Sequence, residues 1–302
     1  MTQHPSPPRP RRSFLFAPAN HARHAAKAFE CGADAVILDL EDAVALSGKT
    51  AARADAVAAL QRPRQCLGYV RINNLGTEFC FEDLCSVVGP WLDGIVLPKV
   101  NGADDLRVAD WCLAALERRH GLAAGRIDLL PIIETAQGIM QAGQIAAALT
   151  RVRRLAFGAG DYALDLGLTW DREEGEFAHA RAIMVAASRA GGLEAPLDSV
   201  FFSLGDDEGL RASARRAQRS GFQGKMGIHP AQIPIINREF TPSASELEQA
   251  RKIVAAFAAA EAKGSASIVV DGAFVDYPIY DKARRSLAIA ATVAAADLAR
   301  KA

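Results

Sequence analysis

The segment ADAVILDLEDAV, residues 33–44, contains the structural unit that repeats along this chain. An apolar run at residues 35–40 ends among acidic residues, and a helix-forming segment at 49–60 separates it from the next apolar run at 68–72. A short apolar run bounded in this way predicts a buried strand, and strands that alternate with helices predict right-handed βαβ units with a parallel sheet. The fold class suggested by this one segment is therefore α/β.

The same alternation continues on both sides of this segment, with about 30 residues per unit. Strands are expected at residues 14–17, 35–40, 68–72, 94–97, 127–133, 155–157, 199–202 and 225–228. Helices are expected, among others, at residues 21–31, 49–60, 104–119, 135–149, 176–189 and 206–219. Eight strand–helix units favour a closed (β/α)₈ barrel, the TIM barrel, over an open sheet.

The two ends of the chain do not fit the barrel repeat. Residues 1–11 contain four prolines and are expected to form a frayed, disordered tail. After residue 240 the sequence predicts a helix at 246–263, a hairpin around Asp271-Gly272 and a last helix from about 282 to 301. The expected organisation is a tail (1–11), a catalytic barrel (12–240) and an appendage (241–302) that packs on the barrel or reaches a neighbouring subunit.

Composition excludes several classes of partner. The chain has 302 residues, with 35 Lys and Arg against 35 Asp and Glu, and half of its residues are apolar. A net charge of zero argues against nucleic acid or an anionic membrane as the main partner. No uncharged apolar span of ~20 residues is present. Five cysteines without a CxxC pair are expected to be reduced and to serve as small apolar residues.

One N-terminal motif resembles an export signal. Arg11-Arg12 precedes Ser-Phe-Leu-Phe, as in a twin-arginine signal, but Pro18 interrupts the apolar run and polar residues follow it. An export signal needs an apolar stretch of ~7–15 residues and a small-residue cleavage site. We therefore expect a cytoplasmic protein.

Polar residues follow six of the predicted strands. In a TIM barrel the carboxyl ends of the strands form the functional face, so these residues are expected to converge there. They are Asp39, Glu41 and Asp42 after the second strand, Arg71 after the third, Lys99 after the fourth, Glu134 after the fifth, residues 158–161 after the sixth and His229 after the eighth.

Glu134 and Asp161 are the candidate metal ligands. They follow adjacent strands, which lie ~4.8 Å apart, and two facing carboxylates repel each other unless a proton or a cation lies between them. Oxygen ligands with space for water suit Mg²⁺. The alternative is that one of the two is a core acid paired with Arg71, or a helix N-cap.

The remaining polar residues have less specific roles. Arg71 is expected to bind a substrate carboxylate or to stabilise an enolate oxygen, the alternative being an ion pair with Asp39 or Glu41. Lys99 is expected to belong to an ion-pair network rather than to form a Schiff base. Gly160 lies in a glycine-rich turn suited to bind an anion, and His229 is expected to cap or hydrogen-bond at the barrel rim.

Several motifs in series resemble a known family. The sequence is similar to the citrate lyase β-subunit-like CoA-ester lyases of the HpcH/HpaI aldolase superfamily, which include malyl-CoA and citramalyl-CoA lyases. The resemblance covers residues 12–290 and rests on SFLFAP (13–18), LDLEDAV (38–44), RIN (71–73), LPK (97–99), IETAQG (133–138), FGAGD (157–161), GKMGIHPAQ (224–232) and VDGAFVD (270–276).

The resemblance implies a Mg²⁺-dependent barrel, usually a homotrimer or hexamer, that cleaves or forms a carbon–carbon bond beside a thioester. It implies that Glu134 and Asp161 bind the metal and that Arg71 contacts the reacting oxygens. It implies that Asp39, Glu41 and Asp42 lie behind these three residues. Asp39 and Glu41 are expected to be catalytic. Lys99 and Gly160 are expected to bind substrate. Asp276 would reach a neighbour's site as acid or base, the alternative being an ordinary hairpin carboxylate. Many relatives carry Gly where this chain has Ala19, which puts the thioester contacts of that loop in doubt.

The expected activity is cleavage or formation of a malyl-CoA- or citramalyl-CoA-type ester, giving acetyl-CoA and a 2-oxo acid, glyoxylate or pyruvate. Three alternatives stay open: a β subunit of a citrate lyase-type complex that acts on a carrier-protein thioester, a barrel that binds acyl-CoA or a 2-oxo acid without turnover, and a CoA-independent 2-oxo-acid aldolase. The two 2-oxo products differ by one methyl group, worth only ~1–3 kcal/mol in a pocket.

Overall fold

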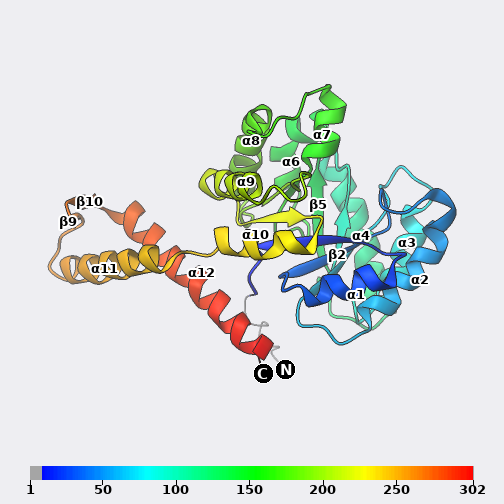
Figure 1. The fold of residues 1–302 in the computed structure, drawn as a ribbon, viewed down its shortest axis with the longest axis horizontal. Coiled ribbons are helices and arrows are strands. Elements are labelled where there is room, and N and C mark those ends of the chain that lie inside the picture. The colour runs from blue at the N-terminus through cyan, green and yellow to red at the C-terminus, as the bar shows by residue number, and fades with distance from the viewer. Residues whose placement is uncertain (1–8, 302) are drawn as a thin grey trace. The chain divides into compact units, whose positions relative to one another are not determined.

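Eight parallel strands close into a barrel in the computed structural model, which describes residues 9–301 (Figure 1). The strands pair in chain order, and β8 closes the ring by pairing with β1. The predicted α/β barrel is therefore confirmed. Its strands are β1 (Ser13–Pro18), β2 (Ala35–Asp39), β3 (Leu67–Arg71), β4 (Gly94–Leu97), β5 (Asp128–Ile133), β6 (Ala156–Phe157), β7 (Leu197–Asp198) and β8 (Gly224–Gly227).

Helices surround the strands on the outside (Figure 1). They are α1 (Ala22–Glu30), α2 (Lys49–Leu60), α3 (Cys80–Val87), α4 (Ala103–Arg119), α5 (Ala136–Met140), α6 (Ala142–Ala146), α7 (Ala159–Leu166), α8 (Ala178–Ala190), α9 (Asp207–Ser220) and α10 (Ile233–Glu239). Short 3₁₀ turns precede three of them, at Leu46–Gly48, Gly175–Phe177 and Pro230–Gln232.

The barrel interior is filled by side chains, so it is a packed core rather than a channel. Successive strand residues point to opposite faces, and one set from all eight strands forms an apolar cluster that includes Phe14, Tyr69, Leu130 and Met226. Gly94 makes room for the Tyr69 ring, since a Cβ at Gly94 would lie 2.2 Å from Tyr69 Cε1. The opposite set packs under the helices in a second, larger cluster.

The structure differs from the sequence prediction at several elements. Strand β7 is Leu197–Asp198, and the predicted strand at 199–202 is instead a loop. The single helix predicted at 135–149 is divided at Gln141 into α5 and α6, each five residues long. Helix α7 begins directly after β6, where the sequence predicted only a glycine-rich turn.

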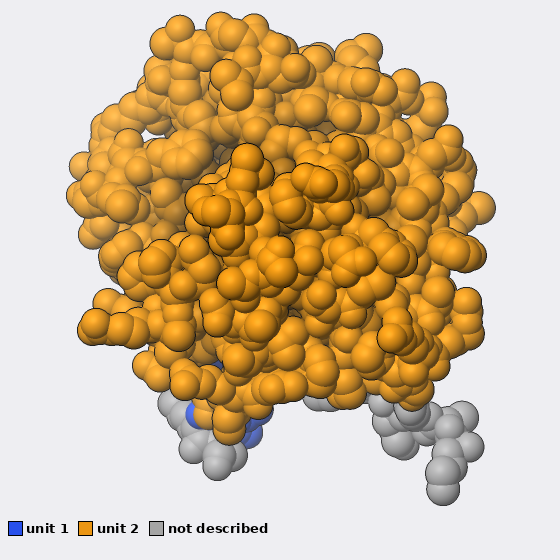
Figure 2. All heavy atoms as spheres, turned by 90° about the vertical axis from the view of Figure 1, so that its right-hand side faces the viewer, with its two compact units in different colours: residues 1–10, 241–302 blue, residues 11–240 orange. Residues whose placement is uncertain are grey.

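The chain after Phe240 belongs to a second compact unit, distinct from the barrel unit Arg11–Phe240; Figure 2 colours the barrel unit orange. Helix α11 (Ala244–Glu261) and helix α12 (Tyr277–Lys301) pack on each other, joined by the hairpin β9 (Ile268–Val270) and β10 (Ala273–Val275). Ser243 begins α11 with a capping box, and Phe257 stacks on Tyr280 at 4.7 Å between ring centroids. A helix–hairpin–helix order is what the sequence predicted.

The last helix begins earlier than predicted, at Tyr277 rather than near residue 282. Pro278 lies in its first turn, where the missing N–H has no helical acceptor in any case. Of the predicted tail, residues 1–8 lie outside the described residues, and Arg11 is part of the barrel unit. Within residues 9–301, none of the helices has the length and apolar character needed to span a bilayer.

Candidate active site

A cavity of about 490 Å³ opens at the carboxyl ends of the barrel strands. Its polar lining is formed by residues that the sequence analysis had singled out, together with one serine: Asp39, Asp42, Arg71, Glu134, Asp161 and Ser199. Its apolar lining comes from strand ends and from the loop after β7: Phe16, Ile132, Val200, Phe202, Met226 and Ile228. The cavity thus combines a charged side with an apolar side.

Arg71 is held rigidly by the acidic loop that follows β2. Its Nε and Nη2 donate to the two oxygens of Asp39 at 2.8 and 2.6 Å, and its Nη1 lies 3.1 Å from Glu41 Oε2. Its guanidinium lies over the Phe16 ring, 4.9 Å from the ring centroid. Burial alone would lower the pKa of Arg71, but Asp39 outweighs it and raises that pKa. The ion-pair alternative is therefore realised, and it fixes one cation at the cavity wall.

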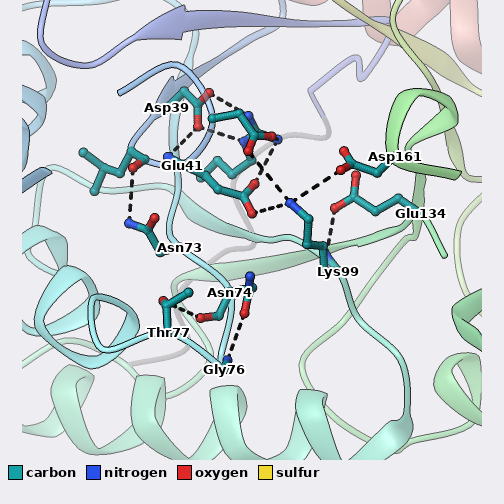
Figure 3. A network of polar contacts seen from close by, with 12 residues as sticks. Asp39, Glu41, Asn73, Asn74, Gly76, Thr77, Lys99, Glu134 and Asp161 are labelled. Carbon is teal, nitrogen blue, oxygen red and sulfur yellow. Dashed lines mark hydrogen bonds and ion pairs between the residues drawn. The ribbon is translucent and has the colours of Figure 1, made fainter. Parts of the chain in front are cut away.

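Lys99 links the acidic loop to the opposite side of the cavity (Figure 3). Its Nζ donates to Glu41 Oε1 at 2.7 Å and lies 3.6 Å from Asp161 Oδ1. Burial would lower the pKa of Lys99, but the hydrogen bond and the charge of Glu41 raise it. A charged lysine in an ion-pair network is what the sequence predicted, in preference to a Schiff-base lysine.

Two further residues hold the acidic loop in place. The buried Lys49 Nζ donates to the carbonyls of Leu40 and Glu41, both at 2.9 Å. Asn73, labelled in Figure 3, donates its Nδ2 to Leu40 O at 3.2 Å. The same Nδ2 donates to Asp83 Oδ2 at 2.6 Å. These contacts provide the Leu40 carbonyl with two donors, and Lys49 adds a second donor to the Glu41 carbonyl, which also accepts from Val44 N at 3.2 Å.

Glu134 is almost completely buried, with 2% of its surface exposed, although it lies directly after β5 at the cavity. Lys99 N–H donates to Glu134 Oε1 at 2.8 Å. Burial, together with the charge of Asp161, raises the pKa of Glu134 to about 8. Gly158 leaves space for this side chain, since a Cβ there would lie 2.3 Å from Glu134 Oε2.

Asp161 lies in the first turn of α7 rather than on a strand, with a third of its side chain exposed. The buried Ser199 Oγ accepts a hydrogen bond from Ala159 N at 2.8 Å and so anchors the start of this helix. The N–H groups of the first helical turn, which includes Gly160, have no carbonyl acceptor within the helix and favour a negative charge nearby. An anionic group of a substrate would therefore be favoured beside Gly160.

The donor set fits a hard divalent cation. Within residues 9–301, no three or more His, Cys, Asp and Glu side chains are grouped to hold a metal on their own. Mg²⁺ often takes only one or two protein carboxylates and completes its shell with water and substrate oxygens. Burial, followed by the charge of Asp161, raises the pKa of Glu134, so these two carboxylates disfavour each other's negative charge. A cation held by Glu134 and Asp161 would offset that repulsion.

Two predicted residues lie elsewhere. His229 caps the 3₁₀ turn after β8, its Nδ1 accepting from Ala231 N at 3.2 Å, which confirms the rim role that the sequence favoured. Asp276 belongs to the second compact unit and directly precedes α12, where its backbone carbonyl accepts from Tyr280 N at 2.9 Å. Its carboxylate lies 3.4 Å from Ile279 N, as expected of a residue that caps a helix.

Sequence analysis missed four residues of this site: Lys49, Asn73, Ser199 and Phe202. Asn73 stood inside the quoted RIN motif, so its position was a usable signal. Lys49 was taken as the start of the helix predicted at 49–60, and Ser199 and Phe202 were assigned to a strand. Only the three-dimensional structure shows that Ser199 and Phe202 line the cavity and that Lys49 binds the acidic loop.

The fold and the site define a (β/α)₈-barrel protein with an acidic, cation-braced cluster on the face where barrel enzymes carry out chemistry. More specifically, the chain belongs to the HpcH/HpaI aldolase/citrate lyase family, which matches residues 12–230. It is 37% identical over 276 residues to citrate lyase subunit beta of Haemophilus influenzae, covering 91% of this chain and 94% of the relative. It is also 37% identical to an L-malyl-CoA/beta-methylmalyl-CoA lyase of Cereibacter sphaeroides, with 91% and 92% covered. The chain is thus placed among the carbon–carbon lyases.

Solved structures agree with this assignment. CitE from Mycobacterium tuberculosis, in complex with magnesium, acetoacetate and coenzyme A, has a TM-score of 0.75 and 32% identity. The match covers 93% of this chain and 98% of that one. A second CitE structure, in complex with magnesium and pyruvate, covers 77% of this chain with a TM-score of 0.64 and 33% identity.

Proposed function

We propose that the chain is a Mg²⁺-dependent CoA-ester lyase. Its reaction cleaves or forms the carbon–carbon bond of a 3-hydroxyacyl-CoA of the malyl-CoA or citramalyl-CoA type, giving acetyl-CoA and glyoxylate or pyruvate. The observation that carries the proposal is the meeting of Glu134, Asp161 and Arg71 at one cavity with an apolar side. The lyase from Cereibacter and the CoA, magnesium and pyruvate bound by CitE support this class of substrate.

Glu134 and Asp161 would hold the cation. When bound, Mg²⁺ would supply a Lewis acid for the oxygens of the 2-oxo acid. Lys99 N–H and the gap at Gly158 keep the Glu134 carboxylate in place. The first turn of α7, at Gly160, would favour the carboxylate of the same substrate.

Arg71 would oppose the negative charge that grows on the thioester oxygen as the bond breaks. Asp39 holds the guanidinium through two hydrogen bonds, so its orientation is set before substrate binds. Asp39 and Glu41, grouped by the sequence with the catalytic residues, contact Arg71 and Lys99 and would act through them as positioning residues. Such preorganisation makes a charge effective in a site that excludes water.

Cleavage also requires that a proton reach the carbon that becomes the methyl group of acetyl-CoA. Asp276 is our candidate for this acid, supplied by the second unit of a neighbouring subunit in a homotrimer or hexamer. Support comes from the VDGAFVD motif, which ends at Asp276.

The test is a coupled assay of the purified protein with Mg²⁺, supplied in parallel with malyl-CoA and citramalyl-CoA. We expect release of glyoxylate from the first or pyruvate from the second, abolished by EDTA and by Glu134→Gln. Asp104→Asn, at an exposed carboxylate on α4, is the matched control and should keep full activity. Release that persists in EDTA would refute the metal-dependent mechanism.

A second candidate function is the β subunit of a citrate lyase-type complex, which the likeness to the Haemophilus subunit favours. Such a subunit would act on a thioester carried by a partner protein. If both CoA esters are inert although Mg²⁺ and acetyl-CoA bind, a pull-down from native cells that recovers an acyl-carrier partner would favour this function. Binding of both ligands without turnover or a partner would leave a non-catalytic binding barrel. Turnover of pyruvate with simple aldehydes would identify a CoA-independent aldolase.

A further inference from the structure

Lys99 has a backbone conformation that a lysine rarely adopts. Its φ is +53°, in the left-handed region that favours glycine. Such conformations persist where the surrounding structure enforces them, often at functional sites. Here the conformation has a definite result, because it aims the Lys99 N–H at Glu134 Oε1, 2.8 Å away.

The side chain of the same residue crosses the site in another direction. Figure 3 shows the ammonium between Glu41 and Asp161, at 2.7 Å from Glu41 Oε1 and 3.6 Å from Asp161 Oδ1. A third carboxylate, Asp42, lies 3.9 Å away. One lysine therefore contacts both proposed metal ligands, Glu134 through its amide and Asp161 through its ammonium.

The charges of the cluster are unequal. Five carboxylates (Asp39, Glu41, Asp42, Glu134 and Asp161) meet two side-chain cations, Arg71 and Lys99, through the contacts described. Arg71 donates two hydrogen bonds to Asp39, whereas the Lys99 ammonium contacts Asp161, one of the two proposed metal ligands. The Lys99 side chain is also more exposed than that of Arg71, at 29% against 10%, and it makes one short contact with the cluster, to Glu41.

We propose that Lys99 is the built-in counter-cation of the site: its ammonium balances Asp161 in the metal-free protein, a divalent cation competes with it there, and its amide keeps Glu134 oriented in both states. This inference rests on the metal site of the proposed function. In the metal-bound state the ammonium keeps its hydrogen bond to Glu41 and gives up Asp161. Lys99 thereby weakens cation binding but limits the repulsion among the carboxylates when no cation is bound.

The experiment measures Mn²⁺ binding directly, from the electron paramagnetic resonance signal of free Mn²⁺, with Mg²⁺ added afterwards as competitor. We expect Lys99→Met to bind Mn²⁺ about five- to tenfold more tightly than the wild type, because a like charge within a few ångströms of the ion has been removed. Lys99→Arg keeps the charge and should stay within about twofold of the wild type. Lys252→Met, at a surface lysine on α11, should bind Mn²⁺ like the wild type.

Thermal unfolding provides a second readout. In EDTA, Lys99→Met should melt below the wild type, because Glu41 and Asp161 lose their counter-cation, and added Mn²⁺ should raise its melting temperature by more than it raises that of the wild type. If Lys99→Met fails to fold, Lys99→Asn removes the same charge with a residue that tolerates the left-handed backbone.

The outcomes are separable. If folded Lys99→Met or Lys99→Asn binds Mn²⁺ as weakly as the wild type, or more weakly, then Lys99 is not the counter-cation of the site. The proposed metal site itself would stand. Absence of Mn²⁺ binding by the folded wild type would overturn the metal site and this inference together. Tighter binding by Lys99→Arg as well would show that side-chain size, and not charge, controls affinity, which also overturns the inference.

Discussion

Gly158 leaves the space that the Glu134 side chain occupies. A Cβ at this position would lie 2.6 Å from Glu134 Cβ and 2.8 Å from Ile132 Cγ2, as well as against the carboxylate. Real Cβ atoms do not approach other atoms so closely, and the barrel core beneath cannot yield freely because it is close-packed. The glycine is therefore required by the neighbouring side chain, since its own φ of −108° is open to other residues.

We predict that Gly158→Ala displaces the Glu134 carboxylate and lowers Mn²⁺ affinity at least about tenfold, with turnover falling at least as far. Overpacking should also destabilise the fold by about 1–3 kcal/mol. Titration of the folded variant with Mn²⁺ measures the first effect and urea unfolding the second. Gly143→Ala, on α6 with no atom within 4 Å of its added Cβ, is the control and should be neutral or slightly stabilising. Wild-type affinity in Gly158→Ala would contradict the prediction.

Most charged site residues could be predicted from sequence because each directly follows an apolar run, and strand ends in a barrel meet on one face. Their partners were harder to predict. Arg71 could equally have bound a substrate or paired with an acid, and the alternation of apolar residues does not distinguish these roles. The left-handed backbone of Lys99 has no sequence signal at all, since the residue is neither glycine nor asparagine.

At the scale of elements, the loop after β7 illustrates where periodicity misleads. Residues 199–202, Ser-Val-Phe-Phe, have the composition of a strand, but Val200 and Phe202 line the cavity. Phe202 packs edge-on against Trp170, with ring centroids 5.1 Å apart, yet 54% of it stays exposed, as a loop residue at the cavity allows. Similarly, Gly138 and Gly143 weaken the helix predicted at 135–149, and the structure divides it. Local composition alone therefore does not identify the element in which these residues lie.

Strands β7 and β8 are tied to α8 by a buried ion network. Asp198 accepts hydrogen bonds from Lys225 Nζ at 2.6 Å and from Arg181 Nε at 2.8 Å. The side chains of Asp198 and Lys225, the two strand residues, are completely buried. Burial would raise the pKa of Asp198, but Lys225 and Arg181 outweigh it and lower that pKa. An acid whose pKa is lowered by folding adds stability above its unfolded value of ~3.9, and that stability is lost as the pH falls through the folded value.

We predict that Asp198→Asn destabilises the protein by about 3–5 kcal/mol at pH 7, because the buried Lys225 loses its carboxylate partner and Arg181 loses one of two. The difference in free energy of unfolding between the variant and the wild type should persist down to about pH 4. Below that pH it should shrink, because the wild type then loses the stability that its ionised Asp198 contributes. Urea unfolding at intervals between pH 3 and 8 measures this. Asp104→Asn, an exposed carboxylate paired with Arg107, should change stability by less than about 0.5 kcal/mol throughout. A pH-independent difference for Asp198→Asn would show that its ionisation is not the cause.

At the scale of the whole molecule, the two compact units divide the proposed chemistry between them. The barrel unit contains Glu134, Asp161 and Arg71, while Asp276 belongs to the other unit. The sequence placed the start of the last helix near residue 282, so the position of Asp276 directly before α12 was not predicted. If Asp276 serves a neighbouring barrel, then two inactive variants should restore each other in a mixed oligomer.

We predict that Asp276→Asn and Glu134→Gln each lose at least about a hundredfold in turnover, and that oligomers containing both regain activity. In a trimeric ring that contains both variants, about a third of the sites pair an intact barrel with an intact Asp276 from the next subunit. Co-expression with two affinity tags, followed by tandem purification, isolates these oligomers for assay. Hetero-oligomers as inactive as either parent would mean that Asp276 acts within its own subunit or has no catalytic role.

The closure of the barrel by β1 and β8 also bears on how the protein is made. Ser13 pairs with Lys225, and Ser13 Oγ donates to Asn237 Oδ1, so the seam joins residues more than 200 positions apart. A growing chain cannot form this seam until β8 has left the ribosome, and until then β1 presents an unpaired edge. The proposed metal ligands follow the neighbouring strands β5 and β6, but the cavity that contains them is also lined by Phe16 of β1 and Met226 of β8. That cavity is complete only after closure. A substrate that fills it would thus stabilise only the closed barrel, and it would add to the driving force for the last step of folding rather than the first.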